Sequence, residues 1–225
     1  MKALLYKEFK LAMHPICYIF VALFPLMILI PSYPIAIGFI YVLTCYPILF
    51  LGANKGQQSN DLLFSTLLPV RKKDIVLARI FTVVIMQFAF VMIMSALYPL
   101  ALSIHSHIPD EKAASVGLGL DAFISVIAIA LIGYSIADLI YFAIYYKKGK
   151  SIVASTLLTI LGFIFYLSIF TIAFPLIPGF EGYTNFLSGP IYIQFIVLGV
   201  SLLIYVLLHI IVYKIASKEL ELVDF

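Results

Sequence analysis

Few side chains in this sequence are able to do chemistry, and most of these lie inside long apolar runs. Ser135 and Asp138 share the run GYSIADLIYF, while Gln87 and His209 each fall in another apolar run. Ionisable groups in such runs are costly to bury and are functional candidates by default. Side chains of these types are able to form a carboxylate pair that shares a proton, a serine activated by a histidine, or a polar contact between helices.

Spacing and local sequence disfavour the two catalytic interpretations. Asp121 and Asp138 lie 17 residues apart in one predicted helix, which separates them by about 25 Å at a rise of about 1.5 Å per residue. A carboxylate dyad is about 3 Å across, so these two residues cannot form one. A rhomboid-like intramembrane serine protease would use Ser135 and His209. Its G-x-S-G motif is absent, because Ile136 stands where a small residue belongs.

Polar contacts between helices are the third interpretation. We expect Asp138 to face a cavity or to pair with Lys147, Lys148 or a basic residue of the 71–79 segment. Such a pair would hold the cytoplasmic ends of the helices together. We expect Gln87 to make a hydrogen bond between helices.

The composition shows what kind of element positions these side chains. The chain has 225 residues, of which 64% are hydrophobic and 11% charged, and its mean hydropathy is +1.15. A soluble domain carries about 25% charged residues, so the solvent of this chain is a bilayer. A membrane helix needs roughly 20 apolar residues. Six blocks meet that length: 11–31, 33–53, 80–104, 119–145, 152–175 and 190–213.

These blocks predict an all-α integral membrane protein in which residues 1–225 form a single transmembrane domain of six helices. All lysines and arginines except Lys112 fall on one side of such an arrangement. Because cytoplasmic loops carry the excess of Lys and Arg, this distribution predicts a multi-pass protein of the cell membrane with both termini in the cytoplasm.

The N-terminal segment 1–14, MKALLYKEFKLAMH, has the pattern of an amphipathic helix. Lys7, Lys10 and His14 are spaced for one face, whereas Phe9 belongs to an apolar face. Such a helix can lie along the inner membrane interface. Alternatively, the segment is a positive flank that only sets the topology.

The predicted cytoplasmic loop 54–79 contains a second apolar segment, 61–68, which is too short to span a bilayer. Pro69 ends it, and the basic residues Arg71, Lys72 and Lys73 follow at the level of the anionic inner leaflet. An apolar helix outside the bilayer needs a cover, which is either a soluble partner or the protein's own bundle. Its apolar residues are Leu62, Leu63, Phe64, Leu67 and Leu68.

At this point the sequence resembles a known family. The stretch STLLPVRKKDIVLAR is similar to the LPvsRkeivlaky segment that follows the second span in type-2 class ABC exporter permeases. The opening MKALLYKEFKLAM and the six-span layout with both ends inside extend the resemblance over essentially the whole chain. Among these permeases the chain is most similar to the small firmicute-type transporters of peptides, phenol-soluble modulins or bacteriocins.

The resemblance implies a role for each cytoplasmic element. It identifies 61–68, with the basic residues 71–73, as the coupling helix that meets a cytoplasmic ABC ATPase, and the first residues as the interface helix. It also implies outward transport and a second permease chain, identical or paralogous. Because the spans offer few charges for binding a polar solute, we expect amphipathic or hydrophobic substrates, with an amphipathic peptide as the first choice and a lipid or lipophilic drug as the second. A non-transporting immunity or anchor subunit is the main alternative within the same architecture.

The chain has no nucleotide-binding motif of its own. The pattern G-x-x-x-x-G-K-[ST] is absent, so the loop that cradles nucleotide phosphates is missing. We therefore expect no enzymatic activity and no cofactor on this chain, with ATP and Mg²⁺ bound by the separate ATPase. His105 and His107 form an H-x-H pair, but a metal site needs convergent ligands in fixed geometry, and we predict no metal. Nor do we expect a nucleic-acid partner.

Overall fold

The computed structural model of the chain describes residues 2–13, 15–30, 70–107, 120–147, 152–169 and 186–222. Every element within these ranges is a helix and none is a strand, which confirms the all-α prediction. In chain order the elements are α1 (Lys2–Lys7), the π-helical η1 (Glu8–Ala12), α2 (Ile16–Leu23), the 3₁₀-helical η2 (Phe24–Leu29), α5 (Lys72–His105), the 3₁₀-helical η5 (Leu120–Ala122), α6 (Phe123–Lys147), α7 (Ile152–Ser168) and α10 (Ile191–Glu221).

Three of the described helices are long and apolar enough to cross a membrane. Helix α5 has 34 residues, the continuous segment Leu120–Lys147 has 28, and α10 has 31. The described part also contains the shorter apolar segments Ile16–Leu29 and Ala154–Ser168. Each of these segments overlaps one predicted span, whereas the predicted span 33–53 lies outside the described residues. The total of six spans therefore stays a prediction.

The first predicted span, 11–31, is interrupted near its start. Met13 has an extended backbone and α2 begins only at Ile16. Pro15 has no N–H group, so a continuous helix would lose a backbone hydrogen bond at this position. Pro25 has the same effect further on, where the α-helix tightens into the 3₁₀ segment η2. The N-terminal helix and the first apolar helix are therefore separate elements.

Helices α5 and α10 both extend beyond their predicted spans at the same end of the molecule. Helix α5 begins at Lys72, whereas the predicted span was 80–104, so its first two turns belong to the predicted loop. Helix α10 continues to Glu221, well past residue 213. In the extra turns of α5, Ile75 and Ala78 are buried and pack with Leu4 of the N-terminal helix. The ends of α5 and α10 also meet. Lys73 Nζ lies 3.2 Å from Glu221 Oε1.

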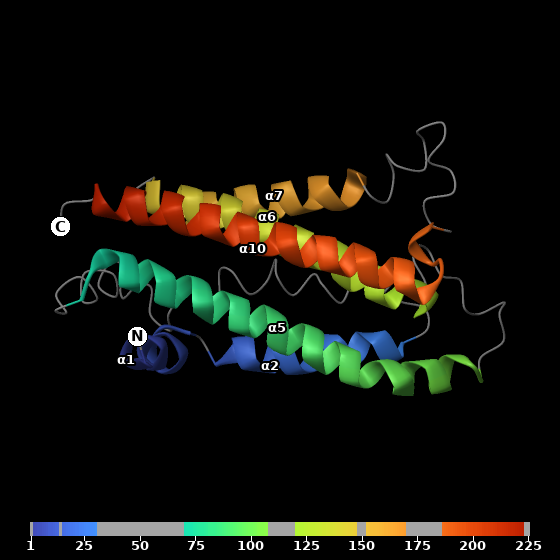
Figure 1. Cartoon of the computed structure of the whole chain (residues 1–225). Coiled ribbons are helices and arrows are strands. Elements are labelled where there is room, and N and C mark those ends of the chain that lie inside the picture. Colours follow the sequence, from blue (N-terminus) through green and yellow to red (C-terminus); the bar gives the residue numbers. More distant parts are fainter. Residues whose placement is uncertain are drawn as a thin grey trace.

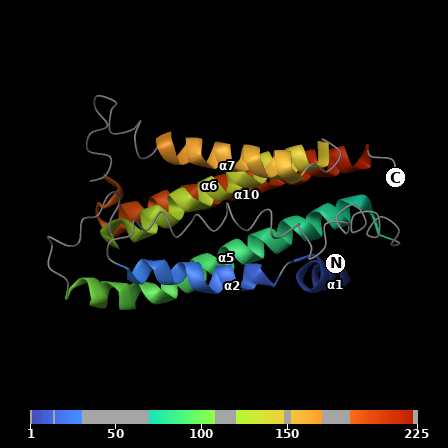
Figure 2. The same ribbon diagram turned by 180° about the vertical axis from the view of Figure 1, so that it is seen from behind.

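The described helices form two layers, which run side by side along the length of the molecule (Figures 1 and 2). The N-terminal layer contains α1, α2 and α5 with their short 3₁₀ and π-helical segments. The C-terminal layer contains α6, α7 and α10, with α6 packed against both of the others. Helix α1 is seen almost end-on in both views, so it crosses the direction of the long helices.

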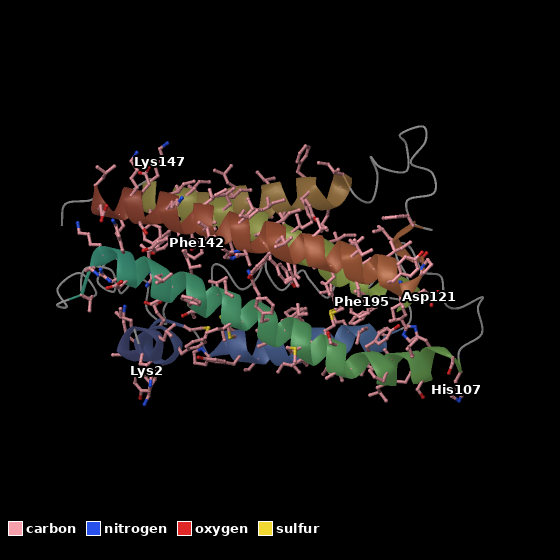
Figure 3. The ribbon with its side chains drawn as sticks, in the orientation of Figure 1. Lys2, His107, Asp121, Phe142, Lys147 and Phe195 are labelled. Carbon is pink, nitrogen blue, oxygen red and sulfur yellow. The ribbon has the colours of Figure 1, made fainter. Side chains whose placement is uncertain are left out.

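Both ends of the described chain lie at one end of this bundle, called here the termini end (Figure 1). Lys2 and Lys147 lie at the termini end, while His107 and Asp121 lie at the opposite end (Figure 3). Helix α5 starts at the termini end and α10 finishes there, so the basic residues of both helix ends gather with Lys2 and Lys147.

Helix α6 is the most enclosed of the long helices. In the most apolar stretch of α6, 67% is buried inside the bundle, whereas the share for α10 is 17%. The outward face of α10 is apolar and suited to lipid. Close packing of α6 on α7 depends on Gly133. A Cβ at this position would lie 2.9 Å from the Phe163 ring and 3.0 Å from the Tyr166 ring. Gly133 therefore allows the two helices to approach, as small residues do in membrane bundles.

Candidate functional site

A cluster of four polar side chains lies inside the bundle and joins three helices. Gln87 of α5 donates from Nε2 to Asp138 Oδ2 of α6 over 2.9 Å. The Tyr205 hydroxyl of α10 donates to Gln87 Oε1 over 2.5 Å. His209, one turn after Tyr205 on α10, places Nε2 3.0 Å from Asp138 Oδ2. We call Gln87, Asp138, Tyr205 and His209 the mid-bundle cluster.

The hydrogen-bond partners assign the protons of this cluster. His209 Nδ1 lies 2.8 Å from the backbone oxygen of Tyr205, which only accepts, so Nδ1 carries a proton. One further proton is shared between His209 Nε2 and Asp138 Oδ2. The pair is therefore either an imidazolium with a carboxylate or two neutral groups, and both forms keep this hydrogen bond. Asp138 is 0% exposed and Gln87 is 2% exposed, so the bonds form away from solvent.

The partners of Asp138 differ from those expected. We expected Asp138 to face a cavity or to pair with Lys147, Lys148 or a basic residue of 71–79. Within the described part of the chain its partners are Gln87 and His209 of α10. Lys148 lies outside the described residues. The reason is geometric, because α6 and α10 run in the same direction along each other and bring these residues to one level. Gln87 makes the interhelical hydrogen bond that its place in an apolar run predicted.

A serine–histidine pair does not form between Ser135 and His209. Ser135 Oγ donates to the backbone oxygen of Ile132 in its own helix, over 2.8 Å. Both ring nitrogens of His209 are occupied by Asp138 and by the Tyr205 backbone. A histidine acting as general base needs one nitrogen directed at the nucleophile. The arrangement of these side chains therefore gives no support to the serine-protease interpretation.

A second buried polar cluster lies at the termini end. Arg79 of α5 donates from Nε to Glu8 Oε2 over 3.1 Å and from Nη2 to Glu8 Oε1 over 3.4 Å. Lys7 Nζ lies 3.4 Å from Glu8 Oε1, and Arg79 Nη1 lies 3.5 Å from the Tyr145 hydroxyl of α6. These four residues, called the ion-pair cluster, join the N-terminal helix to α5 and α6.

The faces of the N-terminal helix differ from the predicted ones. Lys7 and Lys10 were expected on one exposed face, but Lys7 is buried in the ion-pair cluster. The outward basic face instead carries Lys10, whose Nζ lies 2.6 Å from the Tyr6 hydroxyl and 5.1 Å from the centre of that ring. Phe9 packs against the core as predicted, and its backbone oxygen accepts a hydrogen bond from Tyr18. The π-helical η1 changes the spacing of successive residues and so separates Lys7 from Lys10.

Of the predicted coupling residues, the structure describes the basic ones at the start of α5. Arg71 occupies the N-cap position, and its guanidinium makes two hydrogen bonds to Asp74 in the first turn. These bonds raise the pKa of Arg71, which is solvent-exposed. Lys72 opens the helix and Lys73 pairs with Glu221 of α10. The apolar residues Leu62, Leu63, Phe64, Leu67 and Leu68 lie outside the described residues.

The sequence contained signals for the residues that the predictions missed. Glu8 follows the buried Leu4 by one turn, so a carboxylate on this inward face required a partner. Tyr205 precedes His209 by four residues and therefore shares its face of α10. Arg79 was assigned to a loop, and only its place inside α5 directs it into the bundle. Within the described ranges no group of three or more His, Cys, Asp and Glu side chains is arranged to hold a metal ion.

The comparisons with known proteins agree with this architecture. The family described as ABC-2 family transporter protein matches residues 3–218, which is nearly the whole chain. No curated protein and no solved structure matches the chain. A helical bundle with membrane-spanning helices and basic helix ends fits the membrane subunit of such a transporter, which works with an ABC ATPase. The chain therefore belongs to the ABC-2 transporter family and is a multi-pass permease subunit of an ABC transporter.

Proposed function

We propose that this chain is the permease of an ATP-driven exporter that moves amphipathic or hydrophobic substrates, with peptides as the first class to test. Membership of the ABC-2 family supports the permease role, and the resemblance of the 65–79 segment to exporter permeases supports outward transport. The main structural support for this proposal is the ion-pair cluster, because it connects the start of α5 to the N-terminal helix and to α6.

The ATPase would act on the segment directly before α5. In this proposal residues 61–68 dock onto the ATPase, and Arg71, Lys72 and Lys73 hold the turn at the inner leaflet. Movement of that segment would reach α5 through a short connection, since α5 starts at Lys72. Arg79 lies two turns into the helix, where it passes the movement to Glu8 on the N-terminal side and to Tyr145 of the C-terminal layer.

The direction of the chain in the membrane follows from the charges at the termini end. Lys2 and Lys147 lie there, together with the basic start of α5 and the basic end of α10. Because positive charge accumulates on the cytoplasmic side, the termini end faces the cytoplasm in our proposal. The crossing direction of α1 and the outward Lys10 of η1 suit a helix that lies along the inner interface.

The substrate class is inferred from the polarity of the bundle. The described membrane-spanning parts offer few polar side chains for binding a hydrophilic solute, and their outward faces are apolar. Hydrophobic and amphipathic molecules enter such surroundings without losing many hydrogen bonds to water. ATP and Mg²⁺ would bind to the separate ATPase, and a second permease chain, identical or paralogous, would complete the transporter.

The first experiment is purification of the full chain from its native membrane in a mild detergent, with identification of every co-purifying protein. The eluate is assayed for ATP hydrolysis and then reconstituted in vesicles with fluorescent amphipathic peptides. We expect a stoichiometric ATPase and ATP-dependent peptide movement away from the face that binds ATP. A chain that purifies without an ATPase would contradict the proposal. A complex that protects cells from a peptide but moves none would identify the immunity or anchor alternative.

A further inference from the structure

Helix α5 is the element of the N-terminal layer that makes polar contacts with the C-terminal layer at several levels. Near the termini end Arg79 reaches Tyr145, and near the opposite end the Tyr98 hydroxyl donates to the Leu120 backbone oxygen over 3.3 Å. Tyr98 also stacks on Phe123, with ring centres 4.3 Å apart. Between these levels Gln87 makes the contact, deep inside the bundle and away from both interfaces.

The hydrogen bonds of the mid-bundle cluster divide into two kinds. Those of Gln87 cross from one layer to the other, to Asp138 and from Tyr205. The bond between Asp138 and His209, and the bond from His209 to the Tyr205 backbone, both lie within the C-terminal layer. Separation of the layers at this level therefore breaks the bonds of Gln87 and leaves the bond between Asp138 and His209 intact.

This division matters because the two kinds of bond differ in what their loss would expose. A buried carboxylate that loses its partner is very costly, whereas a neutral amide or hydroxyl that loses one is much less so. Each hydrogen bond between membrane helices shifts an equilibrium by roughly threefold on average. The two bonds of Gln87 together are strong enough to favour contact between the layers, yet weak enough to break during a conformational change.

We propose that Gln87 sets the balance between joined and separated helix layers, by two hydrogen bonds that break without removing His209 from Asp138. The cluster thus has a mobile member on α5 and a fixed pair on α6 and α10. The assignment of the separated form to a transport cycle rests on the proposed function. The balance itself is a property of this chain and is measurable without transport.

The experiment measures the distance between the layers by pulsed electron spin resonance on the full chain in lipid nanodiscs. Spin labels are attached at Met92→Cys on α5 and Leu203→Cys on α10, after both natural cysteines have been replaced by alanine. Met92 and Leu203 are 68% and 67% exposed, and they lie about one and a half turns or less along their helices from Gln87 and Tyr205. The quantity compared is the ratio of the long-distance to the short-distance population.

The substitutions form a graded series. Gln87→Met keeps the side-chain length and removes both interlayer bonds, so the ratio should rise about sevenfold to tenfold. Tyr205→Phe removes one bond, so the ratio should rise about threefold. The double variant should match Gln87→Met alone, because the tyrosine hydroxyl has no interlayer partner once Gln87 is gone.

The matched control is Thr82→Val on the same helix. Thr82 is also buried, but its hydroxyl donates to the Ala78 backbone within α5, so its loss should leave the ratio unchanged. A Gln87→Met ratio equal to that of Thr82→Val would overturn the proposal, and so would effects of Gln87→Met and Tyr205→Phe that simply multiply. If Gln87→Met fails to insert, the comparison of Tyr205→Phe with Thr82→Val decides. Absence of an ATPase or of transport would count against the proposed function and leave this result unaffected.

Discussion

The guanidinium of Arg79 and the carboxylate of Glu8, which lie 71 residues apart in the sequence, form a two-bond ion pair in which both side chains are 3% exposed. This pair holds the N-terminal helix against α5 near the termini end of the bundle. It makes neighbours of the N-terminal helix and the first turns of α5, which were predicted as separate elements.

Removing Glu8 alone should destabilise the protein more than removing Glu8 together with Arg79. Glu8→Met takes the shared carboxylate away from two buried cations, Arg79 and Lys7, which should cost about 3–5 kcal/mol of unfolding free energy. Arg79→Met leaves Glu8 beside Lys7 and should cost less. The double variant removes one of the two buried cations and should recover part of the loss caused by Glu8→Met. Unfolding of the purified chain in detergent, followed by heat or denaturant, measures the effect.

A control for this series is Lys10→Met, which removes a charge from the exposed face of the same helix. Surface substitutions of this kind change stability by about 0.5 kcal/mol or less. If the double variant were as unstable as the sum of the two single variants, the direct interaction of Glu8 with Arg79 would not be the cause.

Gly133 and Gly199 should respond in opposite ways to the same substitution. A methyl group at Gly133 would lie 2.9 Å from the Phe163 ring, so Gly133→Ala forces α6 and α7 apart. We expect a loss of about 1–3 kcal/mol from this overpacking. At Gly199 a methyl group meets no atom within 4 Å among the described residues, so Gly199→Ala should be neutral or stabilising. Melting temperatures of the two variants in the same detergent give the comparison, and equal changes would contradict the close α6–α7 contact.

A charge on the apolar face of the 61–68 segment should weaken the ATPase contact. Leu63→Asp places a carboxylate where we expect the apolar docking surface, whereas Ser65→Asp places it on the polar strip of the same predicted helix. We expect the first variant to insert normally and to retain less ATPase during purification, and the second to retain the wild-type amount. Equal retention by both variants would remove the docking role from this segment.

Loss of the Ser135 hydroxyl should have little consequence. The hydroxyl donates only to a backbone oxygen of its own helix among the described contacts, so Ser135→Ala removes no interhelical bond. ATP hydrolysis by the purified complex and its peptide transport should stay within twofold of the wild type. A complete loss of activity in a correctly inserted Ser135→Ala chain would reopen the serine-protease interpretation.

The length of the apolar runs predicted where helices form, because a bilayer forces nearly every apolar run of that length into a helix. Gln87 and Asp138, two of the polar residues singled out in these runs, make a hydrogen bond between helices. Their partners were harder to predict. The partner of a buried polar residue depends on the rotation of each helix about its axis and on which helices touch. Neither property can be predicted from the sequence of a single apolar run.

Regular helix periodicity predicts the wrong face for Lys7. A regular α-helix places Lys7 and Lys10 on nearly the same face, but the π-helical turn from Glu8 to Ala12 breaks that periodicity. Similarly, the basic residues from Arg71 to Arg79 were assigned to a loop by their charge. Most of this stretch is helical, and its partners on α10 and at Glu8 lie too far along the chain to be predicted from local sequence.

The pairing of Asp138 with His209 has a consequence for how the protein is made. The two residues are 71 positions apart, and α10 is the last described helix to be synthesised. When α6 first enters the membrane, this histidine is still inside the ribosome or not yet made, whereas Gln87 on α5 is already in place. Gln87 is therefore able to shelter the carboxylate during biogenesis. A chain cut short before α10 would keep Asp138 in the membrane without His209, and Gln87 would have to hold the carboxylate in its place.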